Sequence, residues 1–374
     1  MNTVKIDFFD EFKCIGGKCP HTCCANWKIL IDDNTKSNYL KADSTLSILG
    51  HLCSKTDRYG NSEMRKLNGR CLFLTHDGLC QFECKQRKDL MPDVCKIYPR
   101  QILKLSNYTE CTLELSCFKA AQIFVSNLKR HSFISSERFE TTSYKINNND
   151  PDFLEFLLKD RDLILDYLWT DTDIDNKFMS IYVSTYEKHK LLMRDRLVDA
   201  YSINSFNIEG FSSSFNNDGF AFFPISFLNG IIYDRLSYPD IKKRNPVVYE
   251  LVSNYKSIFG SLYEKDADAF FNKKLEELFN KNKDFKPLFT SYFSYLIQQT
   301  YINSYEDYYL IGPILLSILH TEFLMLFILV ANISNIYQDK DGYAHIICSL
   351  EKALRHSPSF NKYLINLIRK DFLQ

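Results

Sequence analysis

Clustered cysteines constrain this chain more than any other feature of its sequence. The segment CIGGKCPHTCC, residues 14–24, holds four cysteines in eleven residues, and the last two are adjacent. Eleven of the twelve cysteines precede residue 118, and Cys348 alone lies after it. We therefore expect a cysteine-rich module over residues 1–120 and a second domain over residues 121–374 that serves a different purpose.

The chemistry of thiols narrows the role of this module. The N-terminal sequence MNTVKIDFFDEFKC lacks the basic stretch and apolar core of a secretory signal. We therefore expect a cytoplasmic, reducing location, where clustered cysteines bind metals or catalyse redox reactions more often than they form disulfides. A disulfide-stapled exported domain is the alternative. Thiolates favour zinc, copper(I) or iron–sulfur clusters, and four of them complete one tetrahedral zinc or one 4Fe-4S cluster.

The spacing of the cysteines leaves the identity of the metal open. The sequence contains no pair of CxxC knuckles, so it matches no standard zinc finger. It also lacks a C-x3-C-x2-C motif, because Cys19 and Cys23 are followed by asparagine at position 26. His21 is either a further ligand or a hydrogen-bonding loop histidine. The spacing thus indicates a thiolate-bound metal without naming it.

Composition excludes several classes of function. The net charge is zero, and residues 1–120 hold 18 basic against 14 acidic side chains. That asymmetry is too small for a nucleic-acid-binding face, so no nucleic-acid partner is expected. The sequence has no G-x-G and no HExxH. A dinucleotide fingerprint, a P-loop and a standard zinc-protease site are therefore absent from the sequence.

The second domain reads as helical. Asp150 followed by Pro151, and Asn245 followed by Pro246, are typical helix starts. Further helical patterns cover residues 177–200, 268–280, 287–303 and 341–355. The Ser-, Asn- and Gly-rich stretch 204–219 predicts a long loop near a substrate groove. The expected fold class is mainly α, with a cysteine-rich metal-binding module before a helical domain that recognises the substrate.

One apolar run, residues 308–334, is long enough to span a bilayer. Pro313, His320 and Glu322 interrupt it, and a glutamate at mid-span is costly in lipid. We therefore expect a buried core helix, or two helices that meet near His320, and no membrane insertion.

Four ordered motifs resemble the flagellin lysine-N-methylase family. FKCIGGKCPHTCCANWKILID (residues 12–32) is similar to its opening C-x4-C-x3-C-C-x2-W, and CLFLTHDGLC (residues 71–80) to its second cysteine element. DVCKIYPRQ (residues 93–101) carries its C-x2-YPR, and ECTLELSCFKAA (residues 110–121) its E-x2-L-x-L-S-C-x2-A. The cysteines at family positions are Cys14, Cys19, Cys23, Cys24, Cys71, Cys80, Cys95 and Cys117.

The resemblance implies an enzyme that moves methyl groups from S-adenosylmethionine to lysine side chains of flagellin. It also implies a bound iron–sulfur cluster of the 4Fe-4S type, with those eight cysteines as its candidate ligands and zinc as the alternative metal. Tyr98 and Arg100 of the YPR motif either bind the cofactor or fix the loop after Cys95. Glu110 and Glu114 are candidates for positioning the incoming lysine, or are ordinary carboxylates. Trp27 is expected to pack over the metal site.

A non-enzymatic function is the alternative hypothesis. The same cysteine module also occurs in proteins known only as zinc- or iron-chelating, so the chain is alternatively a non-enzymatic metal carrier, sensor or interaction protein. The catalytic residues, the grouping of the thiols and the number of metals do not follow from the sequence.

Overall fold

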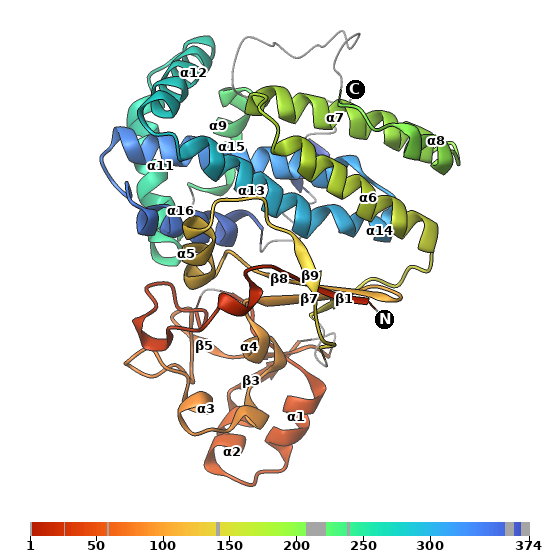
Figure 1. The fold of residues 1–374 in the computed structure, drawn as a ribbon. Helices are drawn as coiled ribbons and strands as arrows, with labels where there is room; N and C mark the ends of the chain where they lie inside the picture. Colours follow the sequence, from red (N-terminus) through yellow and green to blue (C-terminus); the bar gives the residue numbers. More distant parts are fainter. Residues whose placement is uncertain are drawn as a thin grey trace. The chain divides into compact units, whose positions relative to one another are not determined.

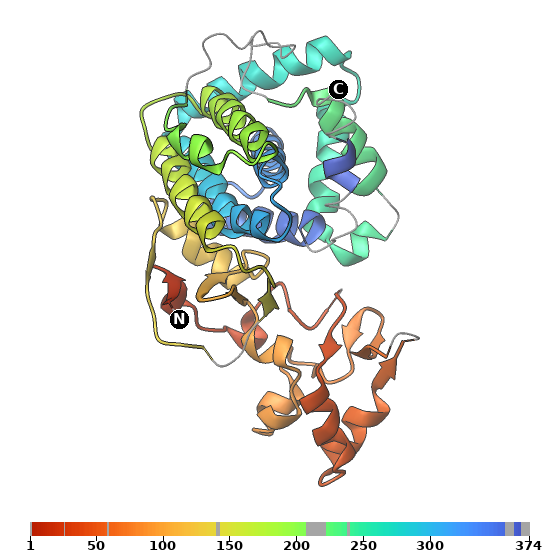
Figure 2. The same cartoon turned by 90° about the vertical axis from the view of Figure 1, so that its right-hand side faces the viewer.

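The computed structural model describes residues 2–25, 27–57, 60–139, 143–206, 222–237, 240–355 and 363–367. The chain divides into two compact units (Figures 1 and 2). The first, here the thiol unit, comprises Met1–Ile123 and Phe133–Lys145. The second, here the helical unit, comprises Phe124–Ser132 and Ile146–Gln374. The boundary falls within helix α5 (Phe118–Ser126).

A five-stranded sheet forms part of the thiol unit, in the order β10-β7-β8-β1-β9. Its strands are β1 (Asn2–Ile6), β7 (Arg100–Lys104), β8 (Tyr108–Leu113), β9 (Phe133–Ser135) and β10 (Tyr144–Lys145). β7 and β8 form an antiparallel pair, whereas β1 runs parallel to β8, with Asn2 opposite Tyr108. The sheet therefore ties the first residues of the chain to the strands that flank the YPR and ECTLELSC motifs.

Two small sheets and short helices build the cysteine-rich part. A three-stranded sheet has the order β2-β4-β3, and β5 pairs with β6. The strands are β2 (Leu30–Ile31), β3 (Ser54–Thr56), β4 (Ser62–Met64), β5 (Lys66–Leu67) and β6 (Arg70–Cys71). The helices are α1 (Asp33–Leu40), α2 (Thr45–Leu52), α3 (Gln81–Cys84) and α4 (Asp93–Ile97), with 3-10 turns η1 (Phe9–Glu11), η2 (Gly16–Lys18) and η3 (Lys88–Leu90).

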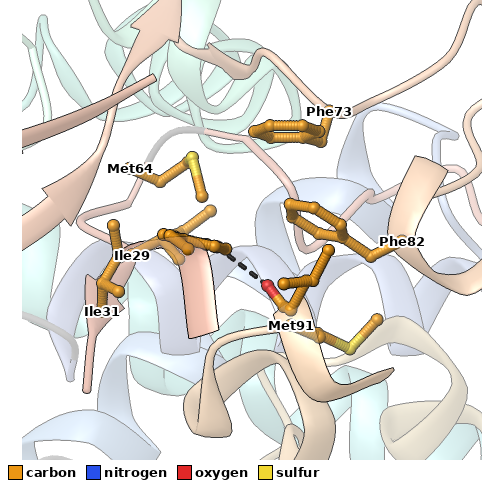
Figure 3. Packing of buried hydrophobic residues seen from close by; sticks show 8 residues of the cluster. Ile29, Ile31, Met64, Phe73, Phe82 and Met91 are labelled. Atoms are coloured by element: carbon orange, nitrogen blue, oxygen red, sulfur yellow. Dashed lines mark hydrogen bonds between the residues drawn. The ribbon is translucent and has the colours of Figure 1, made fainter. Parts of the chain in front are cut away.

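A compact hydrophobic cluster holds these short elements together. Figure 3 shows its side chains, with the rings of Phe73 and Phe82 facing one another at a centroid distance of 4.2 Å. Tyr39 donates its hydroxyl to the Leu90 carbonyl at 2.8 Å, which joins α1 to η3. The buried members are Ile29, Ile31, Tyr39, Met64, Phe73, Phe82, Leu90 and Met91. Cys71, Cys80 and Cys95 pack against this cluster, so the core also positions thiols.

The helical unit consists of helices, and two of them begin at the caps that the sequence predicts. The helices are α6 (Pro151–Leu168), α7 (Ile174–Leu192), α8 (Leu197–Ser202), α9 (Ile225–Arg235), α10 (Ile241–Arg244), α11 (Pro246–Phe259), α12 (Glu264–Lys281), α13 (Phe285–Thr300), η4 (Tyr301–Asn303), α14 (Ser304–Asp307), α15 (Ile311–Ile333) and α16 (Lys340–Leu354). Asp150 caps α6 by accepting from the Phe153 N–H at 3.0 Å. Asn245 does the same for α11 at the Val248 N–H. The prediction of a mainly helical protein is confirmed.

The apolar run forms one continuous helix, α15, rather than two that meet near His320. It is long and apolar enough to cross a membrane, and it is the single helix of that kind among the described residues. In this structure it is buried within the helical unit, where α7, α11, α12, α13 and α16 pack against it (Figures 1 and 2). The Glu322 carboxylate is buried and accepts from the Phe223 N–H at 3.1 Å. The expectation of a buried core helix is confirmed.

Two features differ from the sequence-based expectation or lie outside the structure. The five-stranded sheet was not expected. β8 is buried along its whole length although it contains the polar residues Thr109, Glu110 and Thr112, so its sequence lacks the alternation of apolar and polar residues that indicates a strand. Parallel pairing of β1 with β8 also joins segments a hundred residues apart, which leaves no local signal. Most of the predicted loop 204–219 lies outside the described residues, and its proposed role stays a prediction.

Candidate metal and cofactor site

A cavity of about 830 Å³ lies within the thiol unit. All eight cysteines at family positions line it: Cys14, Cys19, Cys23, Cys24, Cys71, Cys80, Cys95 and Cys117. They reach it from five separate stretches of the chain: residues 14–24, Cys71, Cys80, Cys95 and Cys117. The structure therefore gathers in one place thiols that are up to 103 positions apart in the sequence.

Backbone hydrogen bonds fix the segments that carry these thiols. The Cys71 N–H donates to the Cys24 carbonyl at 2.8 Å, and Ala25 forms a bridge with Arg70. Leu74 forms a second bridge with Cys80, which folds the segment between Cys71 and Cys80 into a closed loop. Cys95 lies on α4, which contacts β2. The thiols thus sit on ordered backbone, although most of the elements are short.

Burial and mutual repulsion disfavour thiolates in this cavity. Burial raises the pKa of Cys95, and the charges of Cys23 and Cys80 raise it further. Burial likewise raises the pKa values of Cys71 and Cys80. The pKa of Cys24 is raised first by a hydrogen bond with Cys23 and then by burial. Since several negative thiolates cannot share this space alone, deprotonation of the set calls for a bound cation.

The chemistry of the donor atoms fits a soft metal. Within the described ranges, no group of three or more Cys, His, Asp or Glu side chains is placed to hold a metal ion. Cysteine sulfur is nevertheless the donor that zinc and iron–sulfur clusters prefer. The eight thiols supply enough ligands for two four-coordinate sites. The predicted ligand set stays a prediction.

Basic side chains predominate among the charged residues that line the cavity. Within the described part of the chain these are Lys13, Lys88, Lys96, Arg100 and Lys119, against one carboxylate, Glu83. Glu83 is itself 3.6 Å from the Lys88 ammonium group. A cavity with this excess of positive charge favours an anionic ligand group.

Tyr98 and Arg100 both line the thiol cavity. The Arg100 guanidinium lies over the rings of Phe12 and Phe9, at 5.1 and 5.6 Å, and donates to the Phe12 carbonyl at 3.3 Å. The Tyr98 hydroxyl pairs with the Ser116 hydroxyl at 3.1 Å. These contacts hold both side chains at the cavity beside Cys95 and Cys117, which is compatible with either role that the sequence left open.

Trp27 also lines the cavity, and its ring packs beside that of Tyr98 with centroids 5.8 Å apart. Its indole N–H donates to the Cys23 carbonyl. His21 lines the cavity too, with its ring 5.5 Å from that of Phe118. These aromatic contacts brace the segment that carries the adjacent cysteines.

Two groups of candidate or incidental residues lie outside the cavity, and one incidental cysteine lines it. Glu110 and Glu114 are not among the described residues that line the cavity, so neither is placed to position a lysine there. Cys111 and Cys348 are buried away from it. Cys84, which matches no family position, does line the cavity and is exposed.

Asp32 is a positioning residue that sequence reasoning missed. Its carboxylate accepts from the Thr35 N–H at 2.8 Å, which caps α1, and from the Asp93 N–H at 2.8 Å, at the start of α4. Burial acts to raise its pKa, but these hydrogen bonds outweigh that effect and lower it. Asp32 thereby joins α1 to the helix that carries Cys95. The D-x-x-T pattern of an N-cap was the available signal.

Comparison with known proteins identifies the relatives of this chain. Flagellar biosynthetic protein FliU from Salmonella muenchen is 27% identical over 116 residues, which cover 29% of this chain and 69% of that protein. Lysine-N-methylase from Salmonella typhimurium is 27% identical over 116 residues, or 29% of each chain. The chain is related to the flagellin lysine-N-methylase family.

The relationship that the motifs predicted is therefore confirmed, over a limited stretch. Lysine-N-methylase from Salmonella choleraesuis is 26% identical over 116 residues, and again 29% of that protein is covered. No protein-family model matches the chain. No solved structure matches it either.

Proposed function

We propose that this protein is an S-adenosylmethionine-dependent lysine N-methyltransferase that acts on flagellin in the cytoplasm. The observation that carries the proposal is the thiol-lined cavity with its excess of basic side chains, in a chain related to proteins named lysine-N-methylase. In this proposal the thiol unit holds the metal and the cofactor, and the helical unit recognises the protein substrate.

S-adenosylmethionine, when bound, supplies an electrophilic methyl group on a sulfonium and carries a carboxylate that the protein can grip. Arg100 suits that carboxylate, because a guanidinium offers five N–H donors in a planar fork. The Phe9 and Phe12 rings orient this fork at the cavity. Tyr98, two residues before Arg100 in the sequence, also lines the cavity.

Transfer of the methyl group forms a C–N bond at the lysine nitrogen and breaks the C–S bond of the sulfonium. The lysine ammonium must first lose a proton, and Glu83 is the one described carboxylate that lines the cavity. Alignment of amine and methyl group accounts for most of the rate gain in such a displacement. We propose that the aromatic wall of Trp27 and Tyr98 excludes water during this step.

The thiols would hold an iron–sulfur cluster, with zinc as the alternative. The cavity fits either, because its donors are sulfur and its walls include the apolar residues Ile29, Met64 and Phe73. Such a group would fix the short elements of the thiol unit around the cavity, whatever else it supplies.

Methylation of purified flagellin by the anaerobically purified chain, with S-adenosylmethionine labelled in its methyl group, tests the proposal. Mass spectrometry should find labelled methyl groups on flagellin lysines. Arg100→Ala should weaken S-adenosylmethionine binding by about 10- to 100-fold, the loss expected for a charged hydrogen bond of ~1.5–3 kcal/mol.

Arg87→Ala is the matched control. Arg87 also belongs to the thiol unit, but it pairs with Asp43 and Asp89 and does not line the cavity. Its replacement should leave cofactor binding unchanged. Metal bound without any S-adenosylmethionine binding would overturn the proposal and favour a metal carrier or sensor.

A further inference from the structure

Ser116 is fully buried and directly precedes Cys117, one of the thiols that line the cavity. Its hydroxyl pairs with the Tyr98 hydroxyl at 3.1 Å. A buried hydroxyl that loses its partner is costly, so this pairing holds both side chains in place. Ser116 thereby connects the turn that carries Cys117 to the segment that follows Cys95.

The backbone fixes the same two segments against each other. They leave the antiparallel β7–β8 ladder side by side, and just past its end the Glu114 N–H donates to the Pro99 carbonyl at 2.8 Å. The Cys117 N–H then donates to the Glu114 carbonyl at 3.1 Å and closes a turn. Because the ladder sets the register of both segments, the hydroxyls of Ser116 and Tyr98 meet at a defined place.

The ring of Tyr98 carries this connection on to Trp27. The two rings pack together with their centroids 5.8 Å apart and their planes at 33°. The Lys66 ammonium group donates to the Trp27 carbonyl at 2.6 Å and holds the tryptophan from its backbone. The Trp27 indole N–H in turn donates to the Cys23 carbonyl. The position of Cys23 therefore depends on a ring that Tyr98 supports.

We infer that Ser116 is a positioning residue for the metal that the thiols hold. Its hydroxyl fixes Tyr98, and the Tyr98 ring orients Trp27. Trp27 then holds the backbone at Cys23. This connection joins the last cavity thiol in the sequence, Cys117, to the pair of adjacent cysteines, so it sets where thiols from distant segments stand when a metal binds. The inference rests on the metal-binding part of the proposed function and adds a residue that does not itself touch the metal.

Anaerobic titration of the metal-free full-length chain with Co²⁺ tests this inference, because the visible absorption of Co²⁺ depends on the geometry of its ligands. Ser116→Ala should lower the Co²⁺ affinity by about 10- to 100-fold, the usual effect of losing a residue that orients a metal ligand. It should also change the absorption spectrum at saturating Co²⁺. An unchanged saturated spectrum would overturn the inference, because a loss of stability alone lowers affinity without altering ligand geometry.

Ser47→Ala is the matched control. Ser47 is fully buried in the same unit, donates its hydroxyl to the Ser44 carbonyl at 2.7 Å in the cap of α2, and is not among the described residues that line the cavity. Its loss can act on the metal only through stability. The affinity should therefore fall by at most about fivefold, the equivalent of ~1 kcal/mol, with an unchanged saturated spectrum. A spectrum altered as much as in Ser116→Ala would overturn the inference.

Tyr98→Phe tests the hydroxyl pair from its other side. The ring that supports Trp27 stays, and only the hydroxyl is lost. This variant should reproduce the affinity and the spectrum of Ser116→Ala. The double variant should be no worse than either single change, because one substitution already breaks the pair. Independent, additive effects of the two substitutions would contradict a role that runs through their contact.

The fluorescence of Trp27 reports on the middle of the connection. The chain has two tryptophans, so Trp27 is the single emitter in a Trp169→Phe background. In the Cd²⁺-loaded chain, its emission maximum should shift when Ser116→Ala or Tyr98→Phe is added, and it should stay constant when Ser47→Ala is added. Identical emission in all of these proteins would overturn the link between Tyr98 and Trp27.

The outcome is separable from methyl transfer. A chain that shows the Ser116→Ala effects on Co²⁺ but, loaded with iron and sulfide, fails to methylate flagellin would refute the proposed function and leave the role of Ser116 intact. A methylating chain in which Ser116→Ala changes neither the Co²⁺ affinity nor the spectrum would refute the role of Ser116 alone.

Discussion

The two units of this chain differ in the interactions that stabilise each of them internally. The cysteine-rich part of the thiol unit, before β7, has short strands, helices of eight residues or fewer, and a hydrophobic cluster of eight buried residues against which half-buried thiols pack. The helical unit has helices of up to 23 residues packed around α15, which is buried along most of its length. A small core cannot by itself offset the conformational entropy of many short elements. The comparison predicts that a metal held by the thiols, as the proposed function requires, would stabilise the thiol unit.

Removal of metal should produce the largest difference in stability between the two units. If metal binding supplies folding free energy to the thiol unit, as for structural zinc at roughly 10–16 kcal/mol, then chelation should unfold that unit and spare the other. Hydrogen exchange should show lost protection in β4 and α1 but retained protection in α13 and α15. Equal protection in both units before and after chelation would contradict this comparison.

The largest effect of one substitution in the helical unit should come from its buried ion pair. Asp160 is buried with Lys188, which donates to it, and the Tyr301 hydroxyl donates to its other oxygen. Asp160→Ala leaves a buried ammonium without its partner and should cost about 3–5 kcal/mol of unfolding free energy. Urea unfolding followed by circular dichroism measures this loss.

Two further variants sharpen that measurement. Replacing both partners, Asp160→Leu with Lys188→Met, should recover most of the lost stability, because no buried charge remains. Lys159→Ala, next in sequence but exposed and paired with Glu155, should cost under about 0.5 kcal/mol. A large loss in Lys159→Ala, or none in Asp160→Ala, would show that burial of the ion pair is not what matters.

The helical unit was also the more predictable of the two. Proline after Asp150 and Asn245 locates two helix starts, and the periodic apolar positions Phe153, Leu157, Ile164 and Leu168 are buried on α6 as the pattern requires. These signals are local, so a single sequence carries them. The fusion of the 308–334 run into one helix was harder to predict, because Pro313 lies in the first turn of α15, where proline is tolerated.

The thiol unit was predictable in its residues but not in its geometry. The cysteine motifs named the thiols that line the cavity, yet no pattern gave the contacts that bring their segments together. That arrangement depends on long-range contacts such as the bond between Cys71 and Cys24. The basic residues around the cavity were missed for the same reason: Lys13, Lys96 and Lys119 look like ordinary surface lysines in the sequence.

Acid should destabilise the helical unit through His320. Burial, followed by the charge of Arg355, lowers the pKa of His320 to about 3. Below about pH 6.5 the unfolded chain therefore binds a proton at His320, whereas the folded chain does not bind it until about pH 3. The contribution of His320 to the unfolding free energy is thus fully present above about pH 6.5 and is lost as the pH drops towards 3. At pH 5 this contribution amounts to about 2 kcal/mol.

His320→Leu isolates this effect. The loss of unfolding free energy between pH 7 and pH 5 should be about 2 kcal/mol smaller in the variant than in the wild-type chain. Burial raises the pKa of neighbouring Glu322, which gives the opposite pH dependence, but that contribution is common to both proteins and cancels in the difference. Equal acid sensitivity of the two chains would mean that His320 is protonated in the folded state.

The smallest effect compares the same cap in both units. Asp339 caps α16 by accepting from the Gly342 N–H at 2.7 Å, as Asp32 caps α1 at the Thr35 N–H. Either change to alanine should cost about 1 kcal/mol of its unit's stability, the usual worth of an N-cap.

Asp32→Ala should in addition release bound metal more readily, because Asp32 also holds the Asp93 N–H at the start of the helix that bears Cys95. Loss of a residue that holds a ligand-bearing segment in place without touching the metal typically lowers metal affinity by about 10- to 100-fold. Cadmium retention against a competing chelator measures this, and equal retention in the two variants would mean that the position of α4 does not depend on Asp32.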